Sequence, residues 1–285
     1  MSGIASASSS IFAPGLLDGQ VALITGGGTG LGRAAARELV ACGARVVVAG
    51  RRLDVLEATA AGIGEAASCV AGDIRDDADA ARIVEAVIER HGRIDLLVNN
   101  AGGQYFTPAE AIATKGWQAV FRLNVGGTER MTDLVVERVM QPAGRGTVVN
   151  VTLSPHNGLA GMTHSSAARA AVESLTRGWA RRWAGDGIAV VAVAAGHFRT
   201  DALDKYPEPV RASVARTVPL QRLGQPAEHG WLVALLASDL GRALSGSVIT
   251  LDGARDNWFG PWPPPGLTDG GGDVPTEQRR PAATR

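Results

Sequence analysis

The sequence predicts a single α/β domain in which helices cover both faces of a parallel sheet. Short apolar runs rich in β-branched residues alternate with longer segments of helical periodicity along most of the chain. The first apolar run passes through a glycine-rich turn directly into a helix. With 285 residues, 45% of them hydrophobic, the chain suits one domain with a large core.

Four apolar runs in the first half of the chain predict strands, and the segments that follow the first three predict helices. The strands are expected at residues 21–25, 45–49, 67–70 and 94–98. The helices are expected at residues 31–41, 53–61 and 76–91. In the last of these, Ile83, Val84, Val87 and Ile88 recur at the spacing of one helical face.

The second half continues the alternation with three more strands and three more helices. The strands are expected at residues 147–151, 188–193 and 247–251, and the helices at 114–140, 165–184 and 227–238. The total is a seven-stranded sheet in a three-layer αβα arrangement. A ligand is expected at the carboxyl ends of the strands.

The ends of the chain differ in composition from the domain, which we expect to span residues 16–257. Residues 1–15 are expected to form a flexible tail, because the first ten are rich in serine and alanine. Residues 258–285 are rich in proline and glycine, with Trp258, Phe259 and Trp262 apolar enough to dock the first part. Residues 201–219, rich in charge and proline, are expected to form a lid.

Charge and cysteine content exclude several classes of function. Lys and Arg together equal Asp and Glu at 28 each, which argues against nucleic acid or an anionic membrane as the main partner. No apolar run approaches the roughly 20 residues of a membrane span. Cys42 and Cys69 lack the spacing of a metal site or a disulfide, so a reducing, cytoplasmic compartment is expected.

The glycine-rich turn carries the first functional signal. Gly26-x-x-x-Gly30-x-Gly32 follows the first strand and opens the first helix. Free N–H groups and the positive end of the helix dipole at such a turn attract a phosphate group, and glycines let it approach closely. The spacing differs from the standard G-x-G-x-x-G fingerprint. A nucleotide site is therefore predicted; the alternative is a turn that serves chain geometry alone.

Several motifs in register resemble those of the short-chain dehydrogenase/reductase family over about residues 16–253. They are Thr25-Gly26-x-x-x-Gly30-x-Gly32, Asp73, Asn99-Asn100-Ala101-Gly102, Asn124 and Gly196-x-x-x-Thr200. Within that family, residues 100–105, 108–110, 115–117 and 164–170 resemble the peroxisomal enoyl-CoA reductases and bacterial members associated with acyl-CoA and terpenoid-acid breakdown. The 2,4-dienoyl-CoA reductases are slightly more distant.

This resemblance implies a doubly wound Rossmann sheet, a nicotinamide cofactor and usually a tetramer. It assigns the cofactor to Thr25, Gly26, Gly28, Thr29, Gly30, Leu31 and Gly32 at the pyrophosphate turn, Asp73 and Ile74 at the adenine, Asn100, Ala101 and Gly102 near the ribose, and Gly196 and Thr200 toward the nicotinamide. It also places Asn124 at a bend of the long helix, where it can hold a water molecule.

The end of the second strand predicts which nicotinamide cofactor is used. NAD-binding strands usually end in an acid that binds the ribose 2′-OH, whereas here the strand ends in Ala49-Gly50-Arg51-Arg52. An arginine fork matches a 2′-phosphate. We therefore expect NADP(H), with Arg51 as the main contact and Arg52 as its helper; the alternative is a solvated pair at a helix start.

The expected active site departs from its family. Most members use Tyr-x-x-x-Lys, but alignment of the helix places Ser165 and Arg169 in those two positions. Serine is a far poorer acid than a phenol, whose pKa is about 10, and arginine stays charged while still able to bind ribose hydroxyls. The loss of the tyrosine handicaps alcohol dehydrogenation more than reduction of a carbon–carbon double bond conjugated to a carbonyl. In the second reaction the developing oxyanion needs hydrogen-bond donors, which Ser165, Thr152 or Ser154 can provide.

Two histidines are candidate substitutes for the missing acid. His156 lies in the loop after the fifth strand, and His164 adjoins Ser165. His197, which follows Gly196 at the cofactor cleft, is a third and weaker candidate. The alternatives are a plain loop residue for His156, helix capping or packing for His164, and an N-cap role for Ser165. Trp179 and Trp183 share one helix face, which we expect at a subunit interface; the alternative is a plain core. The family resemblance implies that this helix packs against another subunit, so a homotetramer or dimer is expected through the long helices, including residues 165–184.

Three functions follow from these residues. The first is an NADP(H)-dependent reductase of an activated alkene such as an enoyl thioester. The second is a carbonyl or imine reductase with a histidine acid. The third is a cofactor-binding scaffold that has lost redox activity and works as a lyase, a cyclase or a regulatory subunit. A CoA substrate would require basic residues at the rim, for which Arg199, Lys205, Arg211 and Arg216 are candidates.

Overall fold

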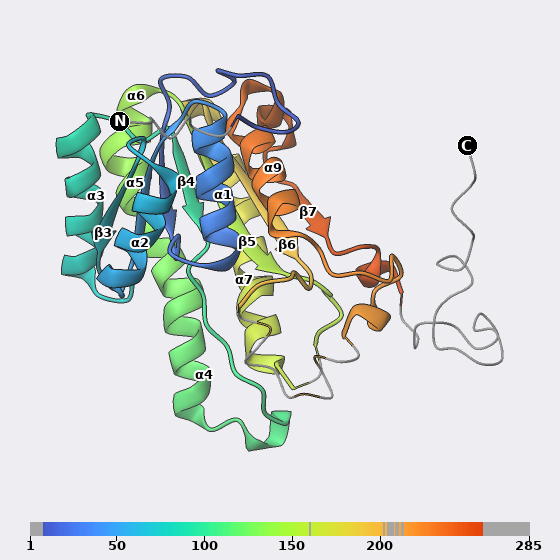
Figure 1. Ribbon diagram of the computed structural model, residues 1–285. Coiled ribbons are helices and arrows are strands. Elements are labelled where there is room, and N and C mark those ends of the chain that lie inside the picture. Colours follow the sequence, from blue (N-terminus) through green and yellow to red (C-terminus); the bar gives the residue numbers. More distant parts are fainter. Residues whose placement is uncertain are drawn as a thin grey trace, which may run out of the picture.

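Seven parallel strands form the centre of the molecule in the computed structural model (Figure 1). The structure describes residues 8–159, 161–201, 203, 208, 211 and 214–258. The strands are β1 (Val21–Thr25), β2 (Arg45–Gly50), β3 (Ala67–Ala71), β4 (Leu96–Asn99), β5 (Gly146–Leu153), β6 (Ile188–Ala195) and β7 (Val248–Leu251). Their order is β3-β2-β1-β4-β5-β6-β7, so the predicted seven-stranded doubly wound sheet is confirmed.

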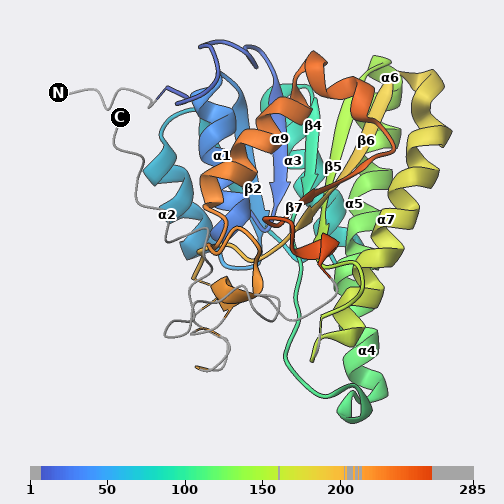
Figure 2. The same ribbon diagram turned by 90° about the vertical axis from the view of Figure 1, so that its right-hand side faces the viewer.

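Helices cover both faces of this sheet, as Figure 2 shows. One layer holds α1 (Gly30–Ala41), α2 (Leu53–Ile63) and α9 (Pro226–Ala237), whose apolar residues share a core cluster with the strands. The other holds α3 (Asp77–His91), α5 (Thr128–Val135) and α7 (Thr163–Trp183) around a second cluster. The shorter helices α4 (Thr114–Phe121) and α6 (Gln141–Ala143) flank α5. The central strands β1, β4, β5 and β6 are buried on both sides, which explains their nearly continuous apolar sequences, whereas the edge strands β3 and β7 are only partly buried.

Two elements differ from the sequence-based expectation in a way that affects the site. β5 and β6 each continue two residues further than expected, because Thr152 pairs with Ala194 and Leu153 with Ala195. The expected helix at 114–140 is continuous but contains π-helical turns at Arg122–Gly127 and Val136–Met140. The longer β5 carries Thr152 to the carboxyl edge of the sheet, and the first π-helical turn contains Asn124.

The paired tryptophans of α7 belong to the core of the chain. Trp179 and Trp183 stack at a centroid distance of 5.8 Å and are 7% and 2% exposed, packed in the cluster with α3 and α5. Our expectation that they form a subunit interface is therefore wrong, since they are already covered within one chain. Ser9 and Phe12, from the expected tail, contact Glu38 and the core respectively. Phe259, Trp262 and Lys205 lie outside the described residues.

Among the described helices, none is both long and apolar enough to cross a bilayer.

Candidate functional site

A cavity of about 420 Å³ lies at the carboxyl ends of the strands and collects most of the predicted residues. The predicted residues that line it are Gly26, Gly28, Thr29, Gly30, Leu31, Arg51, Arg52, Asp73, Ile74, Asn100, Ala101, Gly102, Thr152, Arg169, Gly196 and Thr200. Thr25 and Gly32 do not line it, but each contacts Asn100, which does. Asn124, Ser154, His156, His164 and Ser165 do not line the cavity.

The glycine-rich turn is shaped to receive a phosphate. Gly26 has a φ of +65°, and a Cβ there would lie 2.8 Å from the Ala101 Cα. A Cβ at Gly32 would lie 2.5 Å from Nδ2 of the Asn100 side chain. Gly26 and Gly32 are therefore both positions that require glycine. The Thr29 side chain does not cap α1, which leaves the N–H groups of the first helical turn directed at the cavity. These features fit the pyrophosphate of a dinucleotide.

Asn100 and Thr25 fix this turn to the neighbouring strand. The Asn100 Nδ2 donates to the carbonyl oxygens of Thr25 at 3.1 Å and Gly26 at 3.0 Å. The Thr25 hydroxyl accepts from the backbone N–H groups of Asn100 and Ala101 at 3.1 Å each. Four hydrogen bonds therefore join the ends of β1 and β4, where the cofactor residues of both strands meet.

The adenosine end of the cavity carries two arginines and one carboxylate. Arg51 and Arg52 follow β2, and in the described part of the chain neither forms an ion pair. Asp73 accepts hydrogen bonds from the guanidinium and from the backbone N–H of Arg75. These hydrogen bonds, chiefly those from the guanidinium, lower the pKa of Asp73 to about 2. The carboxylate therefore stays ionised and fixed, while Arg51 and Arg52 remain available to a ligand.

Arg169 supplies a buried positive charge at the opposite end. Its Nη1 donates to the Val151 carbonyl oxygen at 2.8 Å. Burial lowers the pKa of Arg169 to about 10, so the guanidinium remains charged at neutral pH. A Cβ at Gly102 would lie 1.9 Å from Nη2 of Arg169, so only glycine leaves room for this guanidinium.

Gln104 is a site residue that the sequence-based reasoning missed. It lines the cavity, and its Oε1 accepts a hydrogen bond of 2.8 Å from the hydroxyl of the fully buried Ser165. Ser165 thus lies behind Gln104 and orients it, which corrects the expectation that Ser165 itself donates to a substrate oxygen. The two residues are 61 positions apart, so no local pattern predicts their contact.

Asn124 fastens the same loop to the π-helical turn. Its Nδ2 donates to the carbonyl oxygens of Gly103 at 2.9 Å and Val120 at 2.8 Å, and its Oδ1 accepts from the Gly103 N–H. The side chain is completely buried. The amide therefore positions the Gly102–Gln104 wall of the cavity.

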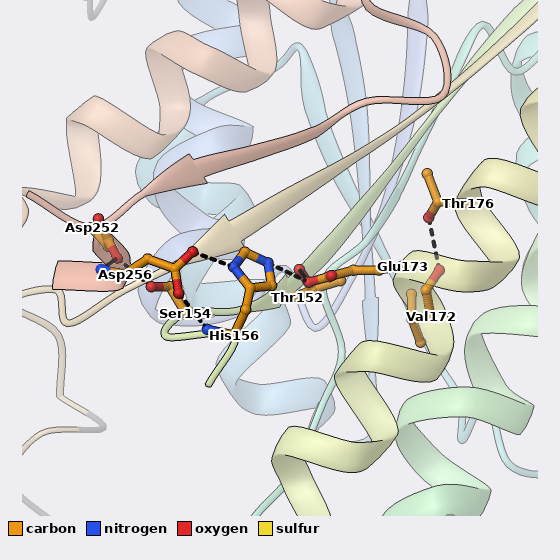
Figure 3. A network of polar contacts seen from close by, with 8 residues as sticks. All are labelled: Thr152, Ser154, His156, Val172, Glu173, Thr176, Asp252 and Asp256. Atoms are coloured by element: carbon orange, nitrogen blue, oxygen red, sulfur yellow. Dashed lines mark hydrogen bonds and ion pairs between the residues drawn. The ribbon is translucent and has the colours of Figure 1, made fainter. Parts of the chain in front are cut away.

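Beside the cavity, a chain of polar contacts runs from Thr152 to the surface (Figure 3). The Thr152 hydroxyl donates to Glu173 Oε1 at 2.8 Å, and the same oxygen lies 3.0 Å from His156 Nε2. Asp256 lies 2.5 Å from His156 Nδ1 and also accepts from its backbone N–H. Burial opposes the charge on the imidazole, but the hydrogen bond to Asp256 and the charge of Glu173 outweigh it and raise the pKa of His156. Glu173 was not among the predicted residues.

The remaining predicted acids are held in other roles. Ser154 is buried, and its hydroxyl donates to Asp252. His164 is buried against Tyr105 and Trp117, and neither ring nitrogen has a hydrogen-bond partner among the described residues, which favours the packing alternative. His197 lines the cavity, but burial and the nearby Arg255 lower its pKa to about 4. It is therefore neutral at neutral pH.

Comparison with known proteins agrees with this arrangement. Residues 26–254 match the protein family described as enoyl-(acyl carrier protein) reductase. A probable 2,4-dienoyl-CoA reductase of Bacillus subtilis is 36% identical over 257 residues, covering 87% of this chain and all of that protein.

Two solved structures share the whole fold. A citronellol catabolism dehydrogenase of Pseudomonas aeruginosa is 38% identical with a TM-score of 0.78, covering 87% of this chain and 99% of that one. A 3-ketoacyl-(acyl-carrier-protein) reductase of Brucella melitensis, complexed with NADH, is 30% identical with a TM-score of 0.80, covering 84% and 99%. The chain therefore belongs to the short-chain dehydrogenase/reductase family of nicotinamide-dependent oxidoreductases.

Proposed function

We propose that this protein is an NADP(H)-dependent reductase of carbon–carbon double bonds conjugated to a carbonyl group, with an enoyl thioester as the substrate type. The observation that carries this proposal is the exchange of the family's Tyr-x-x-x-Lys for Ser165 and Arg169. The described cavity wall holds a fixed cation and amide and hydroxyl donors but no tyrosine. Such a site stabilises an oxyanion better than it protonates an alkoxide.

The side chains divide this work between them. The bound nicotinamide cofactor supplies the hydride. Negative charge then develops on the substrate carbonyl oxygen, which needs hydrogen-bond donors and positive potential. Gln104, oriented by Ser165, presents an amide donor, and Arg169 supplies the potential. The relative named as a probable dienoyl-CoA reductase supports this type of chemistry.

The choice of NADP(H) rests on the end of β2. Arg51 and Arg52 line the cavity there, and no carboxylate follows Gly50 in the position where it would accept from a ribose 2′-OH. A guanidinium matches a 2′-phosphate and forms charge-assisted hydrogen bonds with it. We therefore assign the 2′-phosphate to Arg51, with Arg52 beside it.

We also propose that the protein is a homotetramer of the cytoplasm. The exposed face of α7 begins with small residues, Ala167, Ala170 and Ser174, which allow a second helix to approach closely, and continues with Arg177 and Arg181, which offer positive charge to a partner. The thiols of Cys42 and Cys69 are free, as expected in a reducing compartment.

The test is NADPH oxidation against crotonyl-CoA, a 2,4-dienoyl-CoA and a panel of ketones, with NADPH binding measured alongside. We expect turnover of at least one unsaturated thioester while ketones stay inert. Turnover of ketones alone would favour a carbonyl reductase instead. Tight NADPH binding without any turnover would favour the scaffold that has lost redox activity.

A further inference from the structure

We propose that Thr152, Glu173 and His156 form a proton relay that carries the proton completing the reduction from solvent to the cavity. This inference rests on the proposed function, because it assigns the proton source for that reaction. It answers the question left by the missing tyrosine, and it adds Glu173 to the residues that serve the site.

The geometry gives the relay three contiguous steps. Thr152 lines the cavity and is 4% exposed, with its hydroxyl 2.8 Å from Glu173 Oε1. Glu173 is 5% exposed and meets His156 Nε2 at 3.0 Å through that same oxygen. The His156 side chain is 34% exposed, so it exchanges protons with solvent. Figure 3 shows the imidazole between Glu173 and Asp256.

A purely structural role does not require a carboxylate at this position. Burial of an ionised group is costly unless it is paired. Further down the same strand and helix, Asn150 Nδ2 donates to the Thr176 hydroxyl at 2.9 Å, and this neutral pair joins β5 to α7. Beside the cavity, where proton transfer is needed, β5 and α7 are joined instead through Glu173, which contacts both Thr152 and His156.

The groups that face His156 come from two other elements. Glu173 faces it from α7 and Asp256 from the short helix at Arg255–Asn257. Asp252, after β7, accepts from Ser154 and from the Asp256 N–H and so holds Asp256 in place. Asp256 fixes the imidazole through Nδ1, which directs Nε2 at Glu173. Two carboxylates thus favour the imidazolium, the form that can supply a proton.

The proton step balances without an additional reactant. Hydride addition at the β-carbon leaves an electron pair shared by the α-carbon and the carbonyl oxygen. Once the Thr152 hydroxyl turns from Glu173 toward the substrate, a C–H bond forms at the α-carbon as the Thr152 O–H bond breaks. Thr152 takes the replacement proton from Glu173, which takes it from the His156 imidazolium. His156 is then reprotonated by solvent, and the residues return to their starting state.

The experiment compares Glu173→Gln with the wild type, since glutamine keeps hydrogen bonds but cannot pass a proton. We expect kcat for the unsaturated thioester to fall about 10²–10⁴-fold, the range of general acid–base catalysis, with unchanged NADPH binding. The wild-type kcat should fall on the alkaline side as His156 loses its proton. This limb should disappear in Glu173→Gln. In His156→Ala, added imidazole should restore activity, because the site is open to solvent.

Thr176→Val is the matched control, because it removes the neighbouring β5–α7 hydrogen bond without touching the relay. It should keep the wild-type kcat and pH profile. Retention of both by Glu173→Gln would overturn the relay.

A measurement that needs no substrate distinguishes failure of the relay from failure of the proposed function. NMR titration should show a lower His156 pKa in Glu173→Gln than in the wild type, and an unchanged value would overturn the coupling on which the relay depends. If the wild type reduces only ketones, the proposed function fails while the same variants still test the relay.

Discussion

At the scale of single residues, Arg51 carries the cofactor prediction. Arg51→Ala should lower the preference for NADPH over NADH by about tenfold or more, because a hydrogen bond to a charged group contributes about 1.5–3 kcal/mol. Dissociation constants for both nucleotides measure this. Arg45→Ala is the control, since Arg45 is an exposed arginine at the other end of β2. Equal affinity of the wild type for the two nucleotides would contradict the assignment.

Gly102 and Arg169 form a second residue-scale pair. Gly102→Ala should displace the guanidinium, because the new methyl group would lie 1.9 Å from Arg169 Nη2 and 2.8 Å from Asn124 Oδ1. We expect NADPH affinity to fall by about tenfold, equivalent to about 1.4 kcal/mol, measured by titration calorimetry. In Gly126→Ala the methyl group meets no atom within 4 Å, so affinity should be retained. A normal affinity in Gly102→Ala would show that Arg169 does not contribute to binding.

The residues that could be predicted are those whose role follows from local sequence. Three turn glycines and the two arginines after β2 were found from spacing and strand position and line the cavity: Gly26, Gly28, Gly30, Arg51 and Arg52. Gln104 and Glu173 were missed because each acts through a partner distant in sequence, Ser165 and the Thr152–His156 pair respectively. A glutamate on a helix usually indicates an exposed face, and only the length of β5 and the course of the following loop bury this one.

At the scale of elements, the His156 cluster joins the loop after β5 to α7 and to the segment after β7. The pKa of His156 is raised in the folded protein above its unfolded value of about 6.5. Its contribution to stability is therefore complete below that value and is lost as the pH rises through the folded pKa. The free energy of unfolding of the wild type minus that of His156→Gln should decrease from about pH 6 to about pH 9.

Urea denaturation across this range measures the difference. Glu173→Gln should show a weaker dependence on pH, because one of the two carboxylates that favour the imidazolium is removed. A difference that grows with pH would contradict the direction of the shift.

Elements were predicted well wherever burial determines the sequence. The central strands are apolar on both faces, and all seven strands were located, although their ends differ, most of all where mutual pairing extends β5 and β6 by two residues. The hydrophobic periodicity gave no sign of the π-helical turns, because an inserted residue hardly disturbs it, and only the family resemblance indicated a bend at Asn124. One of them buries Asn124, so this position is set by tertiary contacts with Gly103.

At the scale of the whole molecule, the proposed tetramer has the exposed face of α7 at its interface. This face presents Ala167, Ala170, Ser174 and Arg177. A side chain at the neighbouring Gly178 would meet no atom of its own chain within 4 Å. Gly178→Trp should therefore fold normally but block a partner helix. Light scattering after gel filtration should give four times the chain mass for the wild type and a smaller species for the variant.

Gly62→Trp, on α2 in the other helical layer, is the control and should keep the wild-type mass. A wild-type mass for Gly178→Trp would exclude this face as the interface, and a monomeric wild type would contradict the tetramer.

The central claim concerns where the hydride goes, and one labelling measurement tests it. NADPH deuterated at the transferred position is incubated with crotonyl-CoA and the protein, and the product is examined by NMR. The account predicts deuterium at the β-carbon of a saturated thioester, with an α-hydrogen from solvent. Transfer of deuterium to ketone carbonyl carbons while crotonyl-CoA remains unreduced would contradict it.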